Sequence, residues 1–578
     1  MLFAPLLENL CLSAPSNLEL CYCMKDWQRL PAEWWHSREE ALRTVAVVDR
    51  VRRALGSLSD TMSINLQHTA EDLGGRLTEV DDWKVNLFSE EVVRGSAAFS
   101  VSLLCTRMDP HLRAVAEMGA WQIISPGSAP VTGQVVVVPD LRDVQLDVYP
   151  PNTVMISNQV GGDEEVPEGV AVLITPNAPD VLSHVSVRAR NCSVLFATCY
   201  DAGLLEEWRA QEGKFVAVNL SAAGDVSYAA AAAPSAAGAA EKAGANATRT
   251  KGAVAMQKPA WCGEYAVGMD AFAPGVVGAK SKNLANLRGK LPEWIQLPPS
   301  MAVPFSTLDE VLKVAANKAV REEVEKEYKA VDSDLEGQLQ KCAAAVMRLE
   351  APPALEAALQ AQAAASGVPW GGGGDHWEAA FVALKWVWAS AYNERAYLSL
   401  RKAGLPHAQL CMAVLVQRVV PADYAFVIHT ENPSTGAKDE IYIEMVRGLG
   451  ETLVGNYPGR AYSAVVNKAD LSAPEVRSFP SKSVGLFVDE TLIFRSDSNG
   501  EDLEGYAGAG LYDSVPMHHW REEAVSHDSD PLMADPELRR QVLEAVAKVG
   551  QAVEDALASA QVPPLYIHNA QTSIIGPT

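Results

Sequence analysis

His184 lies in a segment whose residue types could carry phosphoryl chemistry. The segment reads Ser183-His184-Val-Ser-Val-Arg188-Ala-Arg190 and follows an apolar stretch, 170–174, and a proline-rich turn. We expect a short helix with Ser183 at its N-cap and His184 in its first turn. The backbone amides at such a helix start favour an anion. His184 could therefore be a nucleophile whose phosphorylated form Arg188 and Arg190 help to hold. The alternative is a structural histidine at a turn.

A glycine-rich segment near the C-terminus combines an arginine with carboxylates. Residues 494–510 follow an apolar run and contain Arg495, Glu501 and Asp502 among four glycines. Glycines let a backbone approach a ligand closely, arginine pairs with phosphate oxygens, and carboxylates can hold Mg²⁺. The alternative is a glycine-rich turn with an exposed acidic face.

Lys280 and Glu444 are two further candidates for a nucleotide site. Lys280 follows a glycine turn at an expected helix start. The P-loop pattern is excluded because Ala279, not glycine, precedes it. A lysine there can still bind phosphate, and a solvated helix start is the alternative. Glu444 lies on an apolar strand and is a candidate for metal or ribose binding. A salt bridge to Arg447 or Arg395 is the alternative.

Composition shifts along the chain predict a multidomain α/β protein. Residues 1–120 are expected to form a helical region, because apolar residues recur three or four apart. Residues 121–228 contain short β-rich runs typical of a compact α/β domain. An Ala-rich stretch, 229–258, is expected to be a flexible linker. A large α/β region, 259–578, follows, with an expected surface insertion at 351–374.

The charge of the chain excludes some classes of partner. The sequence has 48 Lys and Arg against 72 Asp and Glu, a formal net charge of −24. Such acidity opposes a nucleic acid or an anionic membrane as the main partner. No apolar run approaches the length of roughly 18 residues that a membrane span needs. The first thirty residues resemble neither a signal peptide nor a transit peptide.

Together these motifs resemble the pyruvate phosphate dikinase and phosphoenolpyruvate synthase superfamily. The match extends over most of residues 1–535 and is strongest to the alpha-glucan water dikinases of plants and algae, which phosphorylate starch. The segments that carry it are Trp121–Pro126, Asp180–Asn191, Asn393–Ala396, Asp423–Thr430, Val446–Gly455 and Phe494–Met517.

This resemblance implies a helical layer, a swivelling phosphohistidine domain and an ATP-grasp-like nucleotide domain. It implies transfer of the β-phosphate of ATP through His184 to a glucosyl hydroxyl of an alpha-glucan, with the γ-phosphate passing to water. Ser183, Arg188 and Arg190 would support His184. Lys280, Arg495 and Glu444 would bind ATP, and Glu501 and Asp502 would bind Mg²⁺. A chloroplast location is implied too.

Three features depart from the family pattern. The family's enzymes are much longer and have starch-binding modules and a transit peptide upstream, and neither feature is recognised in this sequence. Its C-terminal strand ends Val-Gln-Thr-Arg-Pro after an acid, whereas residues 570–574 here are Ala-Gln-Thr-Ser-Ile. Its Cys-Phe-Ala-Thr-Cys redox pair becomes Leu195-Phe-Ala-Thr-Cys199, so thiol regulation through that pair is not expected.

Two alternatives stay open. One is a dikinase with another acceptor, although pyruvate is disfavoured because no (β/α)₈ barrel of about 250 residues fits after the nucleotide region. The other is an inactive or regulatory fragment, favoured by the altered C-terminal strand.

Overall fold

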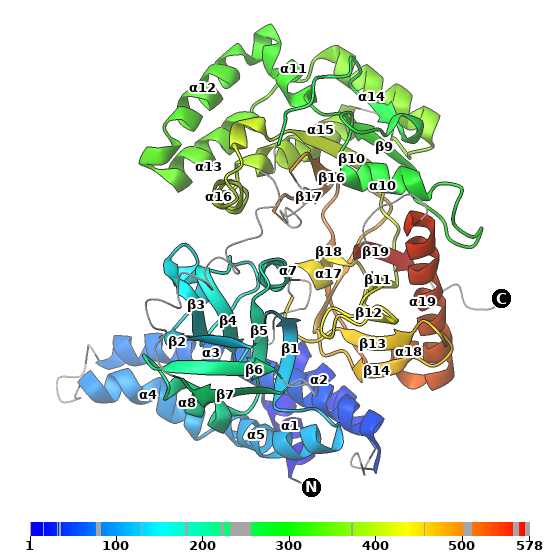
Figure 1. Ribbon diagram of the computed structural model, residues 1–578. Coiled ribbons are helices and arrows are strands. Elements are labelled where there is room, and N and C mark those ends of the chain that lie inside the picture. The colour runs from blue at the N-terminus through cyan, green and yellow to red at the C-terminus, as the bar shows by residue number, and fades with distance from the viewer. Residues whose placement is uncertain are drawn as a thin grey trace.

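We describe a computed structural model of the protein (Figure 1). It describes residues 2–14, 17–31, 33, 36–74, 76, 82–128, 130–177, 179, 183–220, 225–231, 256–371, 374–455, 457–500, 511–558 and 566–572.

The chain begins with a layer of helices. Asn17 and Ser96 cap the second and fifth helices, because their side chains accept a backbone N–H three residues on. None of the helices described in the structure is long and apolar enough to cross a membrane. The helices are α1 (Phe3–Ser13), α2 (Leu18–Gln28), α3 (Arg38–Gly74), α4 (Asp82–Arg94) and α5 (Ala97–Val115).

A seven-stranded sheet, ordered β1-β5-β4-β3-β2-β6-β7, forms what we call the central domain, residues 121–231. Strands β2, β3, β4 and β5 are parallel, and the outer strands are antiparallel. Both faces bury apolar side chains, one under α7 and the other under α8, which accounts for the apolar strands. The elements are β1 (Trp121–Pro126), β2 (Val131–Val138), α6 (Leu141–Val144), β3 (Val148–Ser157), β4 (Glu168–Thr175), α7 (His184–Asn191), β5 (Leu195–Cys199), α8 (Ala202–Arg209), β6 (Phe215–Leu220) and β7 (Val226–Ala230).

Strand β7 runs two residues past the boundary expected at 228, to Ala230. Of the rest of the expected linker, residues 232–255 lie outside the described residues. Met256, which the prediction placed in the linker, is instead buried in the core of the lobe that follows.

What we call lobe A follows and stands at the top of Figure 1. Its sheet has the order β17-β16-β10-β9-β8, and its core includes Trp388, Val414 and Phe494. The elements are β8 (Val267–Gly268), α10 (Ala279–Leu287), β9 (Ser300–Val303), α11 (Thr307–Lys313), α12 (Lys318–Lys329), α13 (Leu335–Val346), α14 (Pro353–Ser366), α15 (Gly374–Ala389), α16 (Glu394–Lys402), β10 (Met412–Arg418), β16 (Leu492–Ser498) and β17 (Ser514–Pro516).

The prediction of a surface insertion at 351–374 is wrong. Helix α14 occupies most of it, and Leu355, Leu359 and Ala363 are at most 1% exposed in the core of lobe A. Alanine is the best helix former, Pro353 stands in the first turn, and Gly367 ends the helix in the left-handed conformation, with φ 68°. Three apolar residues spaced four apart then give the helix one buried stripe, which the low-complexity composition concealed.

What we call lobe B is built on the sheet β14-β13-β12-β11-β19. Helix α19 covers one face of it, at the right of Figure 1, and begins at Pro536, because proline is favoured at the first position of a helix. A two-stranded pair, β15 and β18, lies beside it. The elements are β11 (Tyr424–His429), β12 (Glu440–Arg447), α17 (Glu451–Val454), β13 (Tyr462–Asn467), β14 (Glu475–Ser478), β15 (Val484–Phe487), β18 (Arg521–Ala524), α18 (Pro531–Ala534), α19 (Pro536–Ala558) and β19 (Tyr566–Thr572).

Lobe B and the N-terminal helices share one hydrophobic core. Leu7, Val48 and Leu112 from the helices belong to the same buried cluster as Phe426 and Ile443 of the sheet. The two regions therefore form a single packed body, although hundreds of residues separate them in the sequence. The predicted mixed α/β class is confirmed.

Candidate functional site

Helix α7 places His184 at its first position, directly after Ser183 at the N-cap. The side chain of His184 lies outside the described part of the structure. Ser183 is buried, but its hydroxyl makes no capping bond to a backbone amide; its Oγ lies 2.8 Å from Oγ of Ser186. The N–H of Val185 donates to the carbonyl of Gly162 at 3.0 Å. Neutral groups thus hold the start of α7.

The two arginines of α7 have different surroundings. Arg188 is buried, and its Nε lies 2.9 Å from Oε2 of Glu165, which is buried too. Its charge is therefore compensated inside the central domain. Arg190 is half-buried; its Nη1 donates to the carbonyl of Ile124 at 3.4 Å.

Arg190 also borders a cavity between the central domain and lobe B. The cavity has a volume of about 260 Å³. The central domain contributes the end of β1 and the residues around α7, and lobe B contributes the end of β11 and the turn that follows. The lining residues are Ser125, Pro126, Gly127, Arg190, Ser193, His429, Thr430, Glu431, Asn432, Pro433 and Gly436. Helix α7 therefore faces lobe B across a polar space.

In lobe A, the start of α10 is fastened to β16 by a buried carboxylate. Asp497 accepts from the backbone amides of Gly278, Lys280 and Ser281 at 3.0, 3.0 and 3.3 Å, and from the Ser281 hydroxyl at 2.5 Å. A Cβ on Gly278 would lie 2.3 Å from Oδ1 of Asp497, so only glycine fits there. The amides at the start of α10 bind a protein carboxylate.

Lys280 extends from this turn to the backbone of β16. Its Nζ donates to the carbonyl of Ser496 at 2.9 Å. The fold thus brings Lys280 next to the residue that follows Arg495, although 215 positions separate the two candidates. Their convergence on one strand makes a common ligand geometrically possible.

Arg495 lies among polar groups of both lobes. Its Nη1 donates to Oε1 of Gln417 on β10 at 3.3 Å. Burial raises the pKa of Glu451, at the start of α17, although the positive charge of Arg495 acts to lower it. Arg395 pairs with Asp513, its Nη2 lying 3.8 Å from Oδ1 of the carboxylate. Two carboxylates and two guanidinium groups therefore lie where β16 approaches α17.

Glu444 is buried on β12, where its Oε1 accepts from the hydroxyl of Tyr442 at 3.0 Å. Glu444 pairs with Val427 of β11. Because successive residues of a strand point to opposite faces, and Ile443 and Met445 belong to the core shared with the N-terminal helices, Glu444 lies on the other face of the sheet. The two arginines that were alternatives for it pair with other acids: Arg447 with Asp530 at 3.5 Å and Arg395 with Asp513.

The remaining metal candidates, Glu501 and Asp502, lie outside the described residues. Among the residues that the structure does describe, no group of three or more His, Cys, Asp or Glu side chains could hold a metal ion. Mg²⁺ in nucleotide sites is usually held by one or two carboxylates together with substrate phosphates. Glu451 and Asp513, beside Arg495, fit that pattern.

At the C-terminus, β19 completes the sheet of lobe B. It pairs with β11, and Gln571 stands opposite Ala425. The strand is thus formed despite its atypical sequence. Residue 573, where the resemblance implies arginine, lies outside the described residues.

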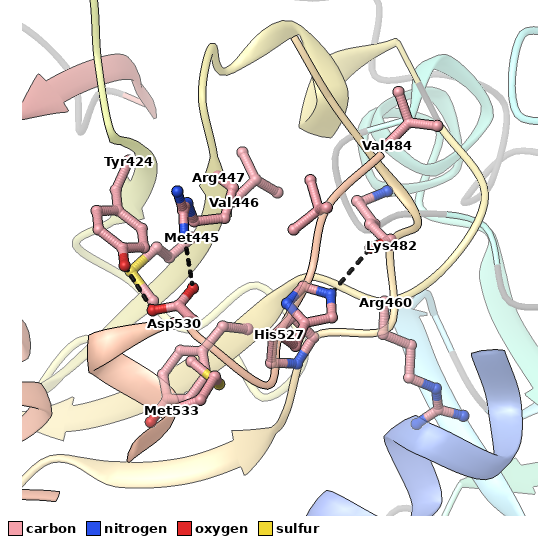
Figure 2. Close-up of a pocket in the computed structure, with 13 residues that line it drawn as sticks. Tyr424, Met445, Val446, Arg447, Arg460, Lys482, Val484, His527, Asp530 and Met533 are labelled. Atoms are coloured by element: carbon pink, nitrogen blue, oxygen red, sulfur yellow. Dashed lines mark hydrogen bonds and ion pairs between the residues drawn. The ribbon is translucent and has the colours of Figure 1, made fainter. Parts of the chain in front are cut away.

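The cavity in Figure 2 does not coincide with any of these candidates. With a volume of about 20 Å³, it has room for a single water molecule. Asp530 accepts from the hydroxyl of Tyr424 and pairs with Arg447. His527 contacts the carbonyl of Lys482 at 2.9 Å. Burial, followed by the charge of Arg50, lowers the pKa of His527 to about 3. This place is a structural junction.

Sequence reasoning missed Asp497 and Asp513 and did not single out Glu451. Asp497 follows Arg495 by two residues on an apolar strand. Residues two apart on a strand lie on the same face, so the sequence could have placed Asp497 beside the candidate Arg495. Asp513 had no comparable signal, because its surroundings come from segments distant in the sequence.

Two family models match parts of the chain. Residues 120–237 match the phosphohistidine-like domain of alpha-glucan water dikinase. Residues 375–478 match the AMP/ATP-binding domain of pyruvate phosphate dikinase. The first range contains the central domain with His184, and the second contains Glu444 and Glu451.

Three curated relatives are similar over almost the whole chain. The chloroplastic alpha-glucan water dikinase of Citrus reticulata is 44% identical over 559 residues, 96% of this chain and 38% of the relative. That of Solanum tuberosum is 45% identical over 558 residues, with the same coverage. Alpha-glucan water dikinase 1 of Arabidopsis thaliana is 44% identical over 559 residues, 96% of this chain and 39% of the relative. The chain thus spans less than half the length of these relatives.

Proposed function

The chain belongs to the alpha-glucan water dikinase family, and we propose that it transfers the β-phosphate of ATP through His184 to an alpha-glucan. The observation that carries this proposal is the position of His184, at the start of α7 in the segment that matches the family's phosphohistidine-like domain. The acceptor and a chloroplast location come from the names of the relatives.

The reaction balances as a double displacement. A ring nitrogen of His184 forms a bond to the β-phosphorus, and AMP leaves with the oxygen that bridged the α- and β-phosphates. Water takes the γ-phosphoryl group and leaves as phosphate. A glucosyl hydroxyl, which the resemblance identifies as the 6-hydroxyl, then attacks the phosphohistidine and loses its proton, and the free imidazole returns. ATP, water and glucan thereby give AMP, phosphate and a glucan phosphate ester.

Lys280 and Arg495 are proposed to bind the phosphates of ATP. Both are on or against β16, and Asp497 fixes the turn that carries Lys280. A preorganised pair of cations costs little reordering when a polyphosphate binds. Glu444, on the face of the lobe B sheet away from the N-terminal helices, is proposed to bind elsewhere on the nucleotide.

Mg²⁺ is proposed to be held by Glu501 and Asp502, or by Glu451 and Asp513. When bound, it supplies positive charge to the phosphate oxygens. The residues around it would orient the polyphosphate: Arg495 and Arg395 balance the carboxylates, which keeps the local charge from repelling ATP.

Around His184, Ser183 and Arg190 are proposed to assist. Arg190 is the arginine of α7 that borders the cavity facing lobe B, so its charge can reach a group outside the central domain. Arg188 has a supporting role only, because it pairs with buried Glu165.

The test is incubation with ATP labelled at the β-phosphate. The wild-type protein is expected to become labelled and His184→Ala to stay unlabelled, while His111→Ala, which alters an exposed histidine, is labelled normally. If neither the wild-type chain nor its Ser573→Arg variant takes up label, the chain is not a dikinase by itself. Starch, pyruvate or no acceptor is then added to the labelled protein. Loss of label to pyruvate instead of starch would replace the proposed acceptor.

A further inference from the structure

Tyr200, directly after β5 of the central domain, contacts two arginines that belong to the rest of the molecule. The guanidinium carbon of Arg113, in α5, is 4.0 Å from the centre of the Tyr200 ring, and that of Arg460, before β13 of lobe B, is 5.1 Å from it. Burial raises the pKa of the Tyr200 phenol, so the ring is neutral and attracts both cations through its π face.

The same place closes the connection by which the chain enters the central domain. Residues 116–120 join α5 to β1. Arg113 donates to the carbonyl of Gly119, and the N–H of Tyr200 donates to the carbonyl of Ala120 at 2.8 Å. The Tyr200 hydroxyl donates to the Gln122 side chain on β1. The Tyr200 contact therefore sits at a covalent hinge of the central domain.

Arg460 is anchored on the body formed by lobe B and the N-terminal helices. Its N–H donates to Oγ of Ser481 at 2.8 Å, and that hydroxyl donates to Oδ2 of Asp49 at 2.6 Å. Arg53 binds both Asp49 and Ser481. Although burial favours the protonated form of Asp49, Arg53 and Arg460 together lower its pKa. The carboxylate is thus ionised and ties α3 to the segment that presents Arg460.

Another part of the same interface contains a cavity. There the cavity of about 260 Å³ separates Arg190 and the end of β1 from the turn after β11. A domain that has close contacts at its hinge and a cavity in its interface can turn about the hinge with the loss of few contacts. The cation–π pair at Tyr200 is then a major part of what favours the docked orientation.

We propose that Tyr200, through its ring contacts with Arg113 and Arg460, is a positioning residue and forms a clamp that holds the central domain docked on lobe B. This rests on the proposed function: docking favours the phosphorylation of His184 by ATP, and release of the clamp favours transfer to the glucan. Two such contacts are worth about a tenfold shift in the docked population.

The kinetic test separates the two half-reactions. Tyr200→Leu keeps apolar bulk and removes the π face; it is expected to slow labelling of His184 from β-labelled ATP about tenfold without slowing transfer from the labelled protein to glucan. Tyr200→Phe keeps the ring and is expected to restore labelling to within about twofold. An equal fall in both half-reactions, or a Phe variant as slow as the Leu variant, would overturn the proposal.

A structural test does not need catalysis. Cys192 in the central domain and Cys262 in lobe A are exposed, so both can carry spin labels once the partly exposed Cys11 and Cys21 are replaced by serine. We expect a narrow distance distribution in the wild type and a broader, longer one in Tyr200→Leu.

Arg460→Gln, which leaves the central domain intact, is expected to act in the same way, and circular dichroism checks that each variant folds. Unchanged distances in both variants would exclude the clamp. If the wild-type protein never takes up label but the two variants still show longer and broader distances than the wild type, the proposed function is refuted and the clamp is kept.

Discussion

Two of the interfaces of lobe B differ in chemistry: the one with the N-terminal helices and the one with the central domain. Towards the N-terminal helices it presents buried apolar side chains such as Phe426 and Ile443, which join Leu7 and Leu112 in one core. Towards the central domain it presents Arg460 against Tyr200 and a polar cavity lined by residues such as His429.

This difference matches the proposed docking, in which one contact is permanent and the other opens. Exposing a fused apolar core to water has a large cost, so the helices and lobe B stay together. The polar surfaces of the other interface can be solvated when it opens, which lowers the cost of separation. A carrier domain that visits two sites needs an interface of the second kind.

The largest expected effect comes from the apolar interface. Phe426→Ala should lower the free energy of unfolding by about 3–5 kcal/mol, because the ring is fully buried in the shared core. Phe99→Ala, at a ring that is 47% exposed on α5, should cost less than about 1 kcal/mol. Denaturant unfolding measures both. Separate transitions for the helices and lobe B would break the comparison, because a shared core predicts that they unfold together.

An intermediate effect is expected from pH at the junction of Figure 2, where lobe B meets α3. Because the folded-state pKa of His527 is lowered to about 3, the unfolded chain takes up a proton near pH 6.5 and the folded protein does not. Stability is therefore lost as the pH falls from 6.5 towards 3, by about 2 kcal/mol between pH 7 and pH 5.

Replacing His527 by glutamine tests this assignment. The variant is expected to have a flatter dependence of unfolding free energy on pH, whereas His111→Gln, at an exposed site, keeps the wild-type slope. Equal slopes in all three proteins would show that the junction does not bury a neutral histidine.

The smallest expected effect concerns the hollow interface. Arg190→Ala should change the unfolding free energy by less than about 1 kcal/mol, because its guanidinium group borders a cavity. Arg188→Ala, on the same helix, should cost about 3–5 kcal/mol, since it removes the guanidinium group that pairs with the buried carboxylate of Glu165. Similar losses for the two variants would show that Arg190, at the cavity, contributes as much to stability as the buried Arg188.

Much of the local structure was predictable from the sequence. The apolar runs 412–417, 424–429 and 441–446 form strands β10, β11 and β12, and the pair Asp535-Pro536 marks the start of α19. The start of α7 at His184 was predictable from Ser183 and the turn before it. These features depend on alternation, helical spacing and caps, which are properties of neighbouring residues.

The sequence by itself thus determined the mixed α/β class, most strands and the helix start that carries His184, because short-range patterns set them. Only the tertiary structure decided that α14 is buried, that Asp497 fastens the turn of Lys280, and that the N-terminal helices merge with lobe B. It also decided that Tyr200 meets Arg113 and Arg460. Each of these features depends on a partner hundreds of residues away or on the surface of another element. The residues next to it in the sequence do not determine which partner or surface it meets.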